Sequence, residues 1–346
     1  MVVRRMSRMW GASLVVALIV SLSLVSMVRA QDATPVPYTA PENAGDLSGT
    51  IIADGSSTVG PITEAVAEDF AAVAGGVQVE INISGTGGGF QRFCNGETDI
   101  QDASRAITEE EMANCRAAGV NYYVFEVAYD GITIVVNPNN DFASCLTTAQ
   151  LKQLWQSDAP ATTWAELDPS FPADTVNLYG PGTDSGTYDY FIEQIIGDDG
   201  STRTDYTPSE NDNDLVEGVA GDDNGLAFFG FGYYEQNQDR LKVAGVDNGS
   251  GCVEPSTETI RDGSYAPLSR PLYVYVRADS LQRVEVQEFM RFYIANAGTL
   301  AAEVGFVASP TEIYVNDQTK VEAEIAGSGA PDGPGEAPAA EASPEA

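Results

Sequence analysis

The stretch GTIIADGSSTVGPITEAVAEDF, residues 49–70, sets the fold class. It opens with a short apolar run, Gly49–Ala53, that is typical of a strand, and apolar residues then recur at helical spacing from Pro61 to Val73. Proline suits the first turn of a helix, because the first N–H groups of a helix have no partner within it. The stretch therefore predicts a strand, a loop rich in glycine and serine at residues 54–58, and a helix.

Strand and helix patterns alternate along the rest of the chain. Short apolar or alternating runs predict strands at 77–83, 98–101, 122–127, 131–137, 176–179, 226–229, 241–243 and 272–276. Helical spacing predicts helices at 88–95, 147–156, 186–196 and 281–296, and a capping-box pattern at 108–111 begins another. This alternation predicts α/β lobes with largely parallel sheets, in which ligands bind where strands end and helices begin.

Two more strand-to-helix loops repeat the chemistry of residues 54–58. They are SGTGGGF, residues 84–90, and GPGTDSGT, residues 180–187. A helix start leaves N–H groups unpaired and carries partial positive charge, while glycine and hydroxyl residues admit and bind an oxyanion such as phosphate. Each loop alone also fits an ordinary helix cap or turn. Together they give the candidate anion ligands Ser56, Ser57, Thr58, Ser84, Gly85, Thr86, Asp184, Ser185, Gly186 and Thr187.

A fourth stretch, DIQDASR at 99–105, ends one of the predicted strands and adds Ser104 and Arg105 to the candidate ligands. We expect the Arg105 guanidinium to be the fixed positive charge of the site. The alternative is a surface arginine that pairs with acidic neighbours. Near neutral pH phosphate still carries a proton and sulfate does not, so a carboxylate that accepts this proton selects phosphate. The candidate acceptors are Asp184, Asp102 and Asp54.

The composition excludes several classes of function. The chain has 346 residues, which suits two domains, and its net charge of −34 excludes non-specific binding to nucleic acid. We expect a soluble monomer. Histidine and C-x-x-C spacings are absent from the sequence, so we expect no metal site, no cofactor and no catalytic residue. The negative charge also repels an anion at long range, so binding has to come from short-range hydrogen bonds.

Residues 1–30 have the pattern of a secretory signal peptide. A basic start is followed by an apolar run from Gly11 to Val28, and small residues at Val28 and Ala30 precede a cleavage point. An uncleaved membrane anchor is the alternative. Both interpretations place the rest of the chain outside the cytoplasm, in the periplasm or at the extracellular face of the cell membrane.

In combination, these loops resemble those of the phosphate-binding component of high-affinity phosphate ABC transporters. The matching stretches are DGSST (54–58), SGTGGGF (84–90), DIQDASR (99–105), GPGTDSGTYDYF (180–191) and PLSRPLYVYV (267–276). The resemblance runs through nearly all of the folded body. It implies a two-lobed periplasmic-binding-protein fold of type II with two hinge strands, capture of inorganic phosphate between the lobes, and delivery to a membrane permease.

The resemblance also implies a division of the chain. Lobe 1 would comprise 49–136 and 270–326, and lobe 2 would comprise 137–269. Segments rich in proline, alanine and acidic residues predict a flexible linker at 31–48 and a disordered acidic tail at 327–346. Four cysteines in an exported chain predict two disulfides. Of the three pairings, we favour Cys94–Cys115 with Cys145–Cys252, because each bridge then stays within one lobe.

Three other functions are compatible with the sequence. The first is binding of another oxyanion, either sulfate or an organic phosphate, which calorimetry with competing anions distinguishes. The second is a phosphatase-type hydrolase, which needs a base or a metal beside a nucleophile. The third is a surface or adhesion module that kept the fold without the transport role and binds no anion.

Overall fold

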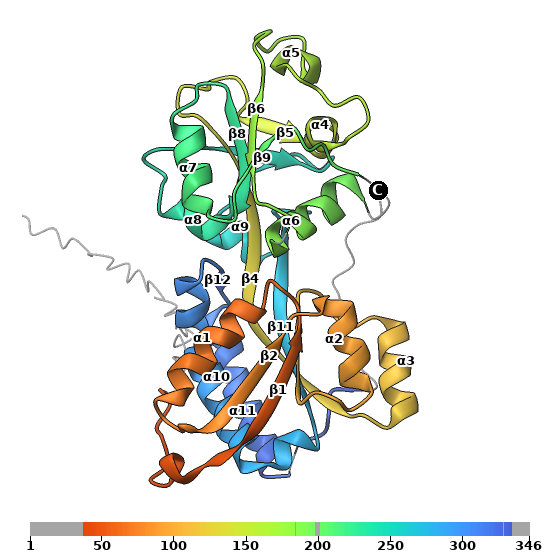
Figure 1. Cartoon of the computed structure of the whole chain (residues 1–346), viewed down its shortest axis with the longest axis vertical. Coiled ribbons are helices and arrows are strands. Elements are labelled where there is room, and N and C mark those ends of the chain that lie inside the picture. The colour runs from red at the N-terminus through yellow and green to blue at the C-terminus, as the bar shows by residue number, and fades with distance from the viewer. Residues whose placement is uncertain (1–36, 184, 198–200, 328, 334–346) are drawn as a thin grey trace, which may run out of the picture. The chain divides into compact units, whose positions relative to one another are not determined.

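The computed structural model describes residues 37–183, 185–197, 201–327 and 329–333. The predicted signal peptide lies outside these residues. The described chain forms two α/β lobes that share two long strands, β4 and β11 (Figure 1).

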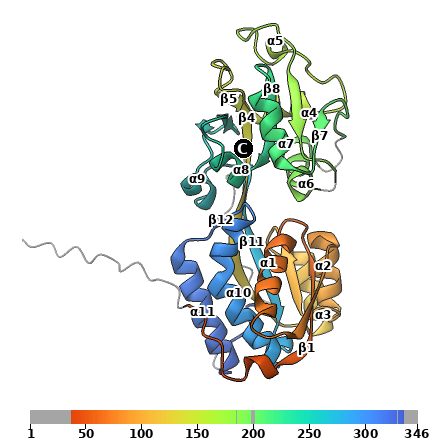
Figure 2. The same ribbon diagram turned by 60° about the vertical axis from the view of Figure 1, so that its left-hand side comes forward.

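Lobe 1 is built on a mixed sheet. Its elements are β1 (Ser48–Gly55), α1 (Gly60–Ala71), β2 (Gly76–Asn82), α2 (Gly85–Cys94), β3 (Ile100–Ala103), α3 (Glu109–Ala118), α10 (Val284–Glu303), β12 (Val307–Ala308) and α11 (Thr311–Ile325), together with parts of β4 (Tyr122–Val136) and β11 (Ser269–Arg277). β1 runs parallel to β2 and to β3, so these three strands end at one edge. Helices α1, α10 and α11 lie on one side of the sheet, and α2 and α3 lie on the other (Figure 2).

The apolar spacing seen in the sequence forms the core of this lobe. Ile62, Val66 and Phe70 of α1 are buried, and the Phe70 ring meets Phe289 of α10 edge to face at 5.3 Å. The capping box predicted at 108–111 is confirmed, because the Thr108 hydroxyl accepts from the Glu111 amide at 3.2 Å and the Glu111 carboxylate accepts in return. Burial of apolar residues thus accounts for the position of α1, and the capping box accounts for the start of α3.

Lobe 2 contains the remaining elements. They are β5 (Cys145–Thr147), α4 (Thr148–Trp155), α5 (Trp164–Leu167), β6 (Asn177–Gly180), α6 (Gly186–Phe191), β7 (Thr207–Pro208), α7 (Asp212–Ala220), β8 (Gly225–Gly230), α8 (Phe231–Glu235), β9 (Lys242–Asp247), β10 (Cys252–Val253) and α9 (Thr257–Arg261). β6 ends directly against the core, because a Cβ atom on Gly180 would lie 3.0 Å from the Trp155 ring. After α6 the chain makes a π-helical turn, Ile192–Ile196.

The chain passes between the lobes within single strands. β4 is continuous over residues that the sequence predicted as two strands, and its first part pairs with β11. From Ile132 to Val136 it pairs instead with β8 and β9 of lobe 2. The chain therefore crosses between the lobes at Asp130 and Gly131, whereas the sequence-based division placed the crossing after residue 136. The reason is that every second side chain of residues 132–136 packs in the core of lobe 2.

Both predicted disulfides are confirmed. Cys94–Cys115 joins α2 to α3, and Cys145–Cys252 joins β5 to β10. Each bridge therefore lies within one lobe.

The described ends of the chain pack against lobe 1. In the segment predicted as a linker, the Tyr38 ring meets Phe292 of α10 at 5.2 Å. In the segment predicted as a tail, the Asp332 carboxylate accepts from the Val124 amide at 2.8 Å and pairs with Lys320. Single aromatic and charged side chains in the described parts of these two segments therefore find partners on lobe 1.

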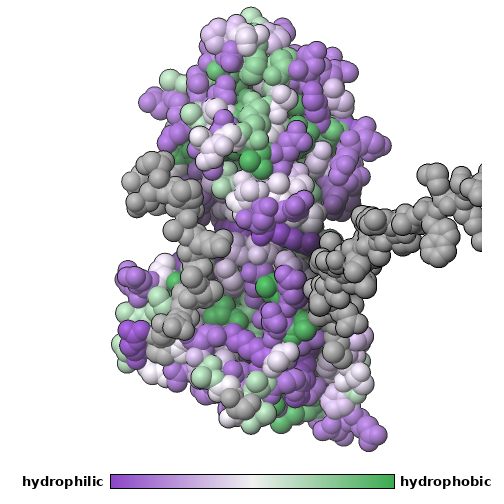
Figure 3. Space-filling model, turned by 180° about the vertical axis from the view of Figure 1, so that it is seen from behind, coloured by the Kyte–Doolittle hydropathy of each residue, from purple (hydrophilic) through white to green (hydrophobic). Residues whose placement is uncertain are grey.

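The surface is largely hydrophilic. Seen from behind, hydrophilic residues cover much of both lobes and the level at which they meet (Figure 3). Among the described residues, the large apolar side chains that stay exposed are Ile83 and Val284. Such scattered apolar residues are ordinary for a protein surface. The described part of the chain contains no helix that is both long and apolar enough to cross a membrane.

Candidate functional site

A cleft of about 1200 Å³ opens between the lobes beside the hinge strands. Its lining combines loops that follow β1, β2 and β3 with the start of α6 and with residues of β11. The predicted ligands that line it are Ser56, Ser57, Thr58, Gly85, Thr86, Ser104, Arg105 and Gly186. Ser84, Ser185 and Thr187 do not line it, and Asp184 lies outside the described residues. The structure thus brings together loops from both lobes, as the sequence predicted.

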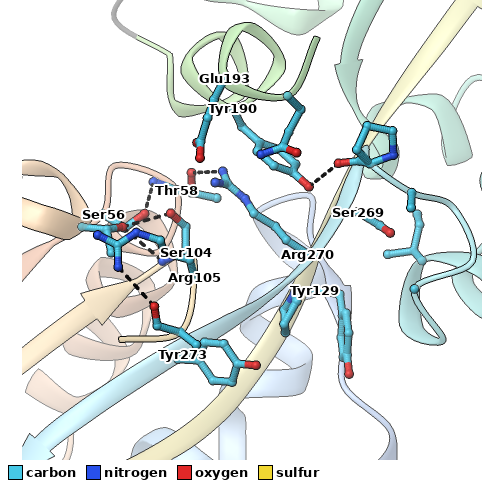
Figure 4. Close-up of a pocket in the computed structure, with 18 of the residues that line it drawn as sticks. Ser56, Thr58, Ser104, Arg105, Tyr129, Tyr190, Glu193, Ser269, Arg270 and Tyr273 are labelled. Atoms are coloured by element: carbon cyan, nitrogen blue, oxygen red, sulfur yellow. Dashed lines mark hydrogen bonds between the residues drawn. The ribbon is translucent and has the colours of Figure 1, made fainter. Parts of the chain in front are cut away.

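The loop after β1 positions Thr58. The Ser56 hydroxyl oxygen accepts from the amides of Thr58 at 3.1 Å and Val59 at 3.4 Å, so Ser56 caps this turn. The Ser56 amide in turn donates to the Asp102 carbonyl at the end of β3, at 2.9 Å. Two neighbouring strand ends are therefore tied together, and the Thr58 side chain is left to face the cleft (Figure 4).

The loops after β2 and β3 meet at a pair of hydroxyls. Thr86 Oγ1 lies 3.0 Å from Ser104 Oγ and accepts from the Ser104 amide at 3.2 Å. Ser84 has a different role, because its hydroxyl donates to the buried Asp54 carboxylate at 2.8 Å. Thr86 and Ser104 are thus the hydroxyls of these loops that are placed to meet a ligand.

Arg105 is held by an acidic neighbour. Its Nη1 and Nη2 donate to the two carboxylate oxygens of Glu111 at 2.8 and 2.9 Å. Burial acts to raise the pKa of Glu111, but the hydrogen bonds from Arg105 and Thr108 outweigh it and lower that pKa. The guanidinium therefore lines the cleft while both of its terminal nitrogens donate to Glu111. Pairing with an acidic neighbour is the alternative that the sequence analysis gave for Arg105.

Sequence reasoning missed Arg270, which reaches the centre of the cleft from β11. Its Nη2 donates to Thr58 Oγ1 at 3.0 Å, and its Nε and Nη2 donate to the buried Asp130 carboxylate at 3.2 and 3.1 Å. Its guanidinium carbon lies 3.6 Å from the centre of the Tyr190 ring of lobe 2 (Figure 4). One side chain thus contacts lobe 1, the hinge and lobe 2. The available signal was a single arginine in the strand-like stretch PLSRPLYVYV.

The start of α6 approaches the lobe 1 loop closely. A Cβ atom on Gly186 would lie 2.7 Å from Thr58 Oγ1 and 2.8 Å from Ser57 Oγ, so glycine is needed for this approach. The Ser185 hydroxyl oxygen caps its own helix, accepting from the Thr187 amide at 3.2 Å and the Tyr188 amide at 3.5 Å. Gly186 is therefore the point at which the loop of lobe 2 meets the predicted ligands of lobe 1.

Comparisons with known proteins agree with this geometry. Residues 40–297 match the model of a PBP superfamily domain. Protein SphX of Synechocystis is 47% identical over 270 residues, which cover 77% of this chain and 80% of the relative. The phosphate-binding protein PstS of Staphylococcus saprophyticus is 40% identical over 282 residues, which cover 81% of this chain and 86% of the relative. This chain belongs to the PBP superfamily, among the relatives of phosphate-binding proteins.

Solved structures confirm the two-lobed α/β fold of this family member. A possible phosphate binding protein from Planctomyces limnophilus is 42% identical with a TM-score of 0.77, over 81% of this chain and 99% of that one. An ABC-type phosphate transport receptor from Vibrio cholerae is 22% identical with a TM-score of 0.59, over 74% of this chain and 99% of that one, and this likeness shows the fold alone.

Two of the three carboxylates predicted to accept a ligand proton, Asp54 and Asp102, do not line the cleft, and the third, Asp184, lies outside the described residues. Asp54 and Asp102 are both fully buried (0% exposed) and absent from its lining. Burial raises the pKa of Asp102 to about 7, against the hydrogen bond from Thr63 and with a further rise from Asp54. Among the described residues of lobe 2, the carboxylates that line the cleft are Asp189, Glu193 and Asp262, and Glu193 points toward Thr58 (Figure 4).

Proposed function

We propose that this protein captures inorganic phosphate in the cleft between its lobes and delivers it to the permease of an ABC transporter. The observation that carries the proposal is Arg270, a cation at the hinge that donates to Thr58 of lobe 1 and stacks on Tyr190 of lobe 2. The Staphylococcus relative is named a phosphate-binding protein and the Planctomyces structure a possible phosphate binding protein, and both names support phosphate as the anion.

Arg270 supplies the fixed positive charge in this proposal. The Asp130 carboxylate balances its charge, which lets a largely buried arginine be retained at the hinge. Because Thr58 Oγ1 accepts from Arg270, the hydroxyl hydrogen of Thr58 is free to donate to a ligand. The arginine thus orients a second donor as well as offering its own N–H groups.

Ligand contacts from both lobes favour the closed form. Ser57, Thr58, Thr86 and Ser104 belong to lobe 1, whereas Gly186 belongs to lobe 2. An anion that contacts both sets stabilises the arrangement in which they are close. Several charge-assisted hydrogen bonds away from water give an affinity that is micromolar or tighter, on the order of 8 kcal/mol or more. The permease would then recognise the closed lobes.

We propose Glu193 as the acceptor of the ligand proton. It extends from the π-helical turn after α6 toward the Thr58 side of the cleft (Figure 4). Turns of this kind occur frequently at functional sites. A carboxylate in this place accepts the proton of hydrogen phosphate and repels sulfate, which has none. Selectivity would therefore come from lobe 2, whereas the sequence had suggested acceptors on both lobes.

Export is part of the proposal. The basic start and apolar run of residues 1–30 support secretion, with the folded chain at the outer face of the membrane. The net charge of −34 supports a soluble protein.

Calorimetric titration of the exported protein with phosphate and with sulfate tests the proposal. We expect phosphate to bind at least about a hundredfold more tightly than sulfate, about 2.7 kcal/mol. Glu193→Gln should bind sulfate more tightly than the wild type does, so that the difference between phosphate affinity and sulfate affinity becomes smaller. The matched control is Asp189→Asn, one helical turn away on the same wall. A wild-type protein that binds sulfate as tightly as phosphate would refute phosphate as the specific ligand, and one that binds neither would refute anion capture.

A further inference from the structure

A buried carboxylate lies directly behind the proposed anion site. Asp54 is fully buried at the end of β1. Its Oδ1 accepts from the amide of Gly55 at 2.7 Å, the amide of Ser84 at 3.0 Å and the hydroxyl of Ser84 at 2.8 Å. Ser84 precedes α2, whose first residues Gly85, Thr86 and Gly87 line the cleft. The carboxylate and a bound anion would therefore share one helix end.

Two anions at one helix end oppose each other. The positive partial charge at a helix start extends over its first turn, and Asp54 already makes use of it through Ser84. Like charges in a partly buried setting repel more strongly than in water, because the surroundings screen them less. An ionised Asp54 with no counter-charge would lower the affinity of this wall of the cleft for phosphate.

Arg92 provides the counter-charge. Its Nη1 pairs with Asp54 Oδ2, on the oxygen that Ser84 does not use. Its Nε pairs more loosely with Glu97, at 3.3 Å. Arg92 lies in the last turn of α2 and does not line the cleft, so its guanidinium does not contact a ligand there.

We infer that Arg92 is a positioning residue for anion binding that acts by compensating the charge of Asp54. The pair divides two tasks. Asp54 fixes the start of α2 through two hydrogen bonds from Ser84, and Arg92 removes the electrostatic cost of placing a carboxylate there. This inference rests on the proposed function, because it concerns the affinity of the same cleft for its anion.

A purely structural tie between β1 and α2 is the competing explanation, and a double variant separates the two. Asn at position 54 keeps a side-chain oxygen for the Ser84 amide and hydroxyl but carries no charge. Met at position 92 keeps the apolar stem of arginine and removes its charge. Charge compensation predicts that Asp54→Asn restores the affinity lost in Arg92→Met. A structural tie predicts that the second substitution adds to the loss.

The experiment measures phosphate and sulfate affinity by calorimetry, with the thermal unfolding midpoint of each variant as a folding control. We expect Arg92→Met to weaken phosphate binding about tenfold, and Arg92→Lys, which keeps the charge, to stay within about threefold of the wild type. The double variant should also return to within about threefold of the wild type. Arg240→Met is the matched control, because Arg240 on lobe 2 is equally exposed at 38% and pairs with Glu217 alone.

Two results would overturn the inference while the proposed function stands. They are unchanged phosphate affinity in Arg92→Met, and a double variant that binds no better than Arg92→Met. If Arg92→Met does not fold, Arg92→Gln takes its place with the same expectations. A wild-type protein that binds neither anion overturns the proposed function and this inference together, and the wild-type titration shows that before any variant is compared.

Discussion

Replacing Gly186 with alanine tests whether the lobes must touch at the start of α6. The new Cβ atom would lie 2.7 Å from Thr58 Oγ1 and 2.8 Å from Ser57 Oγ, whereas ordinary contact begins at 3.4 Å. The facing loop would therefore have to retreat by about 0.7 Å, the difference between these distances. Overpacking of a close contact costs about 1–3 kcal/mol, which corresponds to about 5- to 150-fold weaker phosphate binding.

The assay is calorimetry of Gly186→Ala with phosphate, accompanied by thermal unfolding. Alanine favours a helix over glycine, so we expect the unfolding midpoint of the unliganded protein to stay the same or to rise. Gly45→Ala is the control, because a Cβ atom there meets nothing within 4 Å. Wild-type phosphate affinity in Gly186→Ala would refute the prediction that phosphate binding needs this close approach of the two lobes.

Four further predictions address other parts of the molecule. Arg270→Gln should weaken phosphate binding by about 2–4 kcal/mol, whereas Arg105→Ala should weaken it by less than about 1 kcal/mol. The reason is that both terminal nitrogens of the Arg105 guanidinium already donate to Glu111, whereas Arg270 faces Thr58 at the proposed anion site. Equal losses of phosphate affinity in the two variants would contradict this ranking. Burial raises the pKa of Asp102 from 3.8 to about 7, so its contribution to stability is complete below pH 4 and is lost as the pH rises to about 7. The free energy of unfolding of Asp102→Asn should therefore rise relative to that of the wild type between pH 4 and pH 8. If the two free energies differ by the same amount at every pH in this range, the prediction is wrong. Opening Cys145–Cys252, which spans 107 residues, should destabilise by up to about 4–5 kcal/mol in denaturant titrations, more than opening Cys94–Cys115, which spans 21. With a net charge of −34, the association rate for phosphate should rise with ionic strength in stopped-flow mixing, and a falling rate would show that local positive potential dominates.

The glycine and hydroxyl loops were predictable because their geometry is set locally. The loops after β1, β2 and β3 converge because parallel strands end at one edge of a sheet, and their sequences carry the turn chemistry directly. The sequence could not show which hydroxyl faces the cleft and which one caps its own turn. Ser56 and Ser185 cap their own turns and Ser84 serves Asp54, and these choices depend on neighbours from other loops.

The charge at the centre of the cleft was beyond prediction for a different reason. Arg270 meets Asp130 across 140 residues of sequence, through the antiparallel register of β4 and β11. Nothing near Arg270 in sequence indicates that register, whereas Arg105 stands beside a recognisable loop. The crossing at Gly131 was missed similarly, because a strand that changes partners midway shows no break in its apolar pattern.

The packing of Trp155 against the end of β6 has a consequence for optical experiments. The chain has three tryptophans, of which Trp10 falls in the predicted signal peptide and Trp155 and Trp164 lie in the core of lobe 2. Tryptophan emission, excited selectively over that of the tyrosines, would then come from one lobe of the secreted protein alone. A fluorescence melting curve would follow that lobe, and its comparison with circular dichroism, which senses the backbone of both, would reveal whether the halves lose structure together or in sequence.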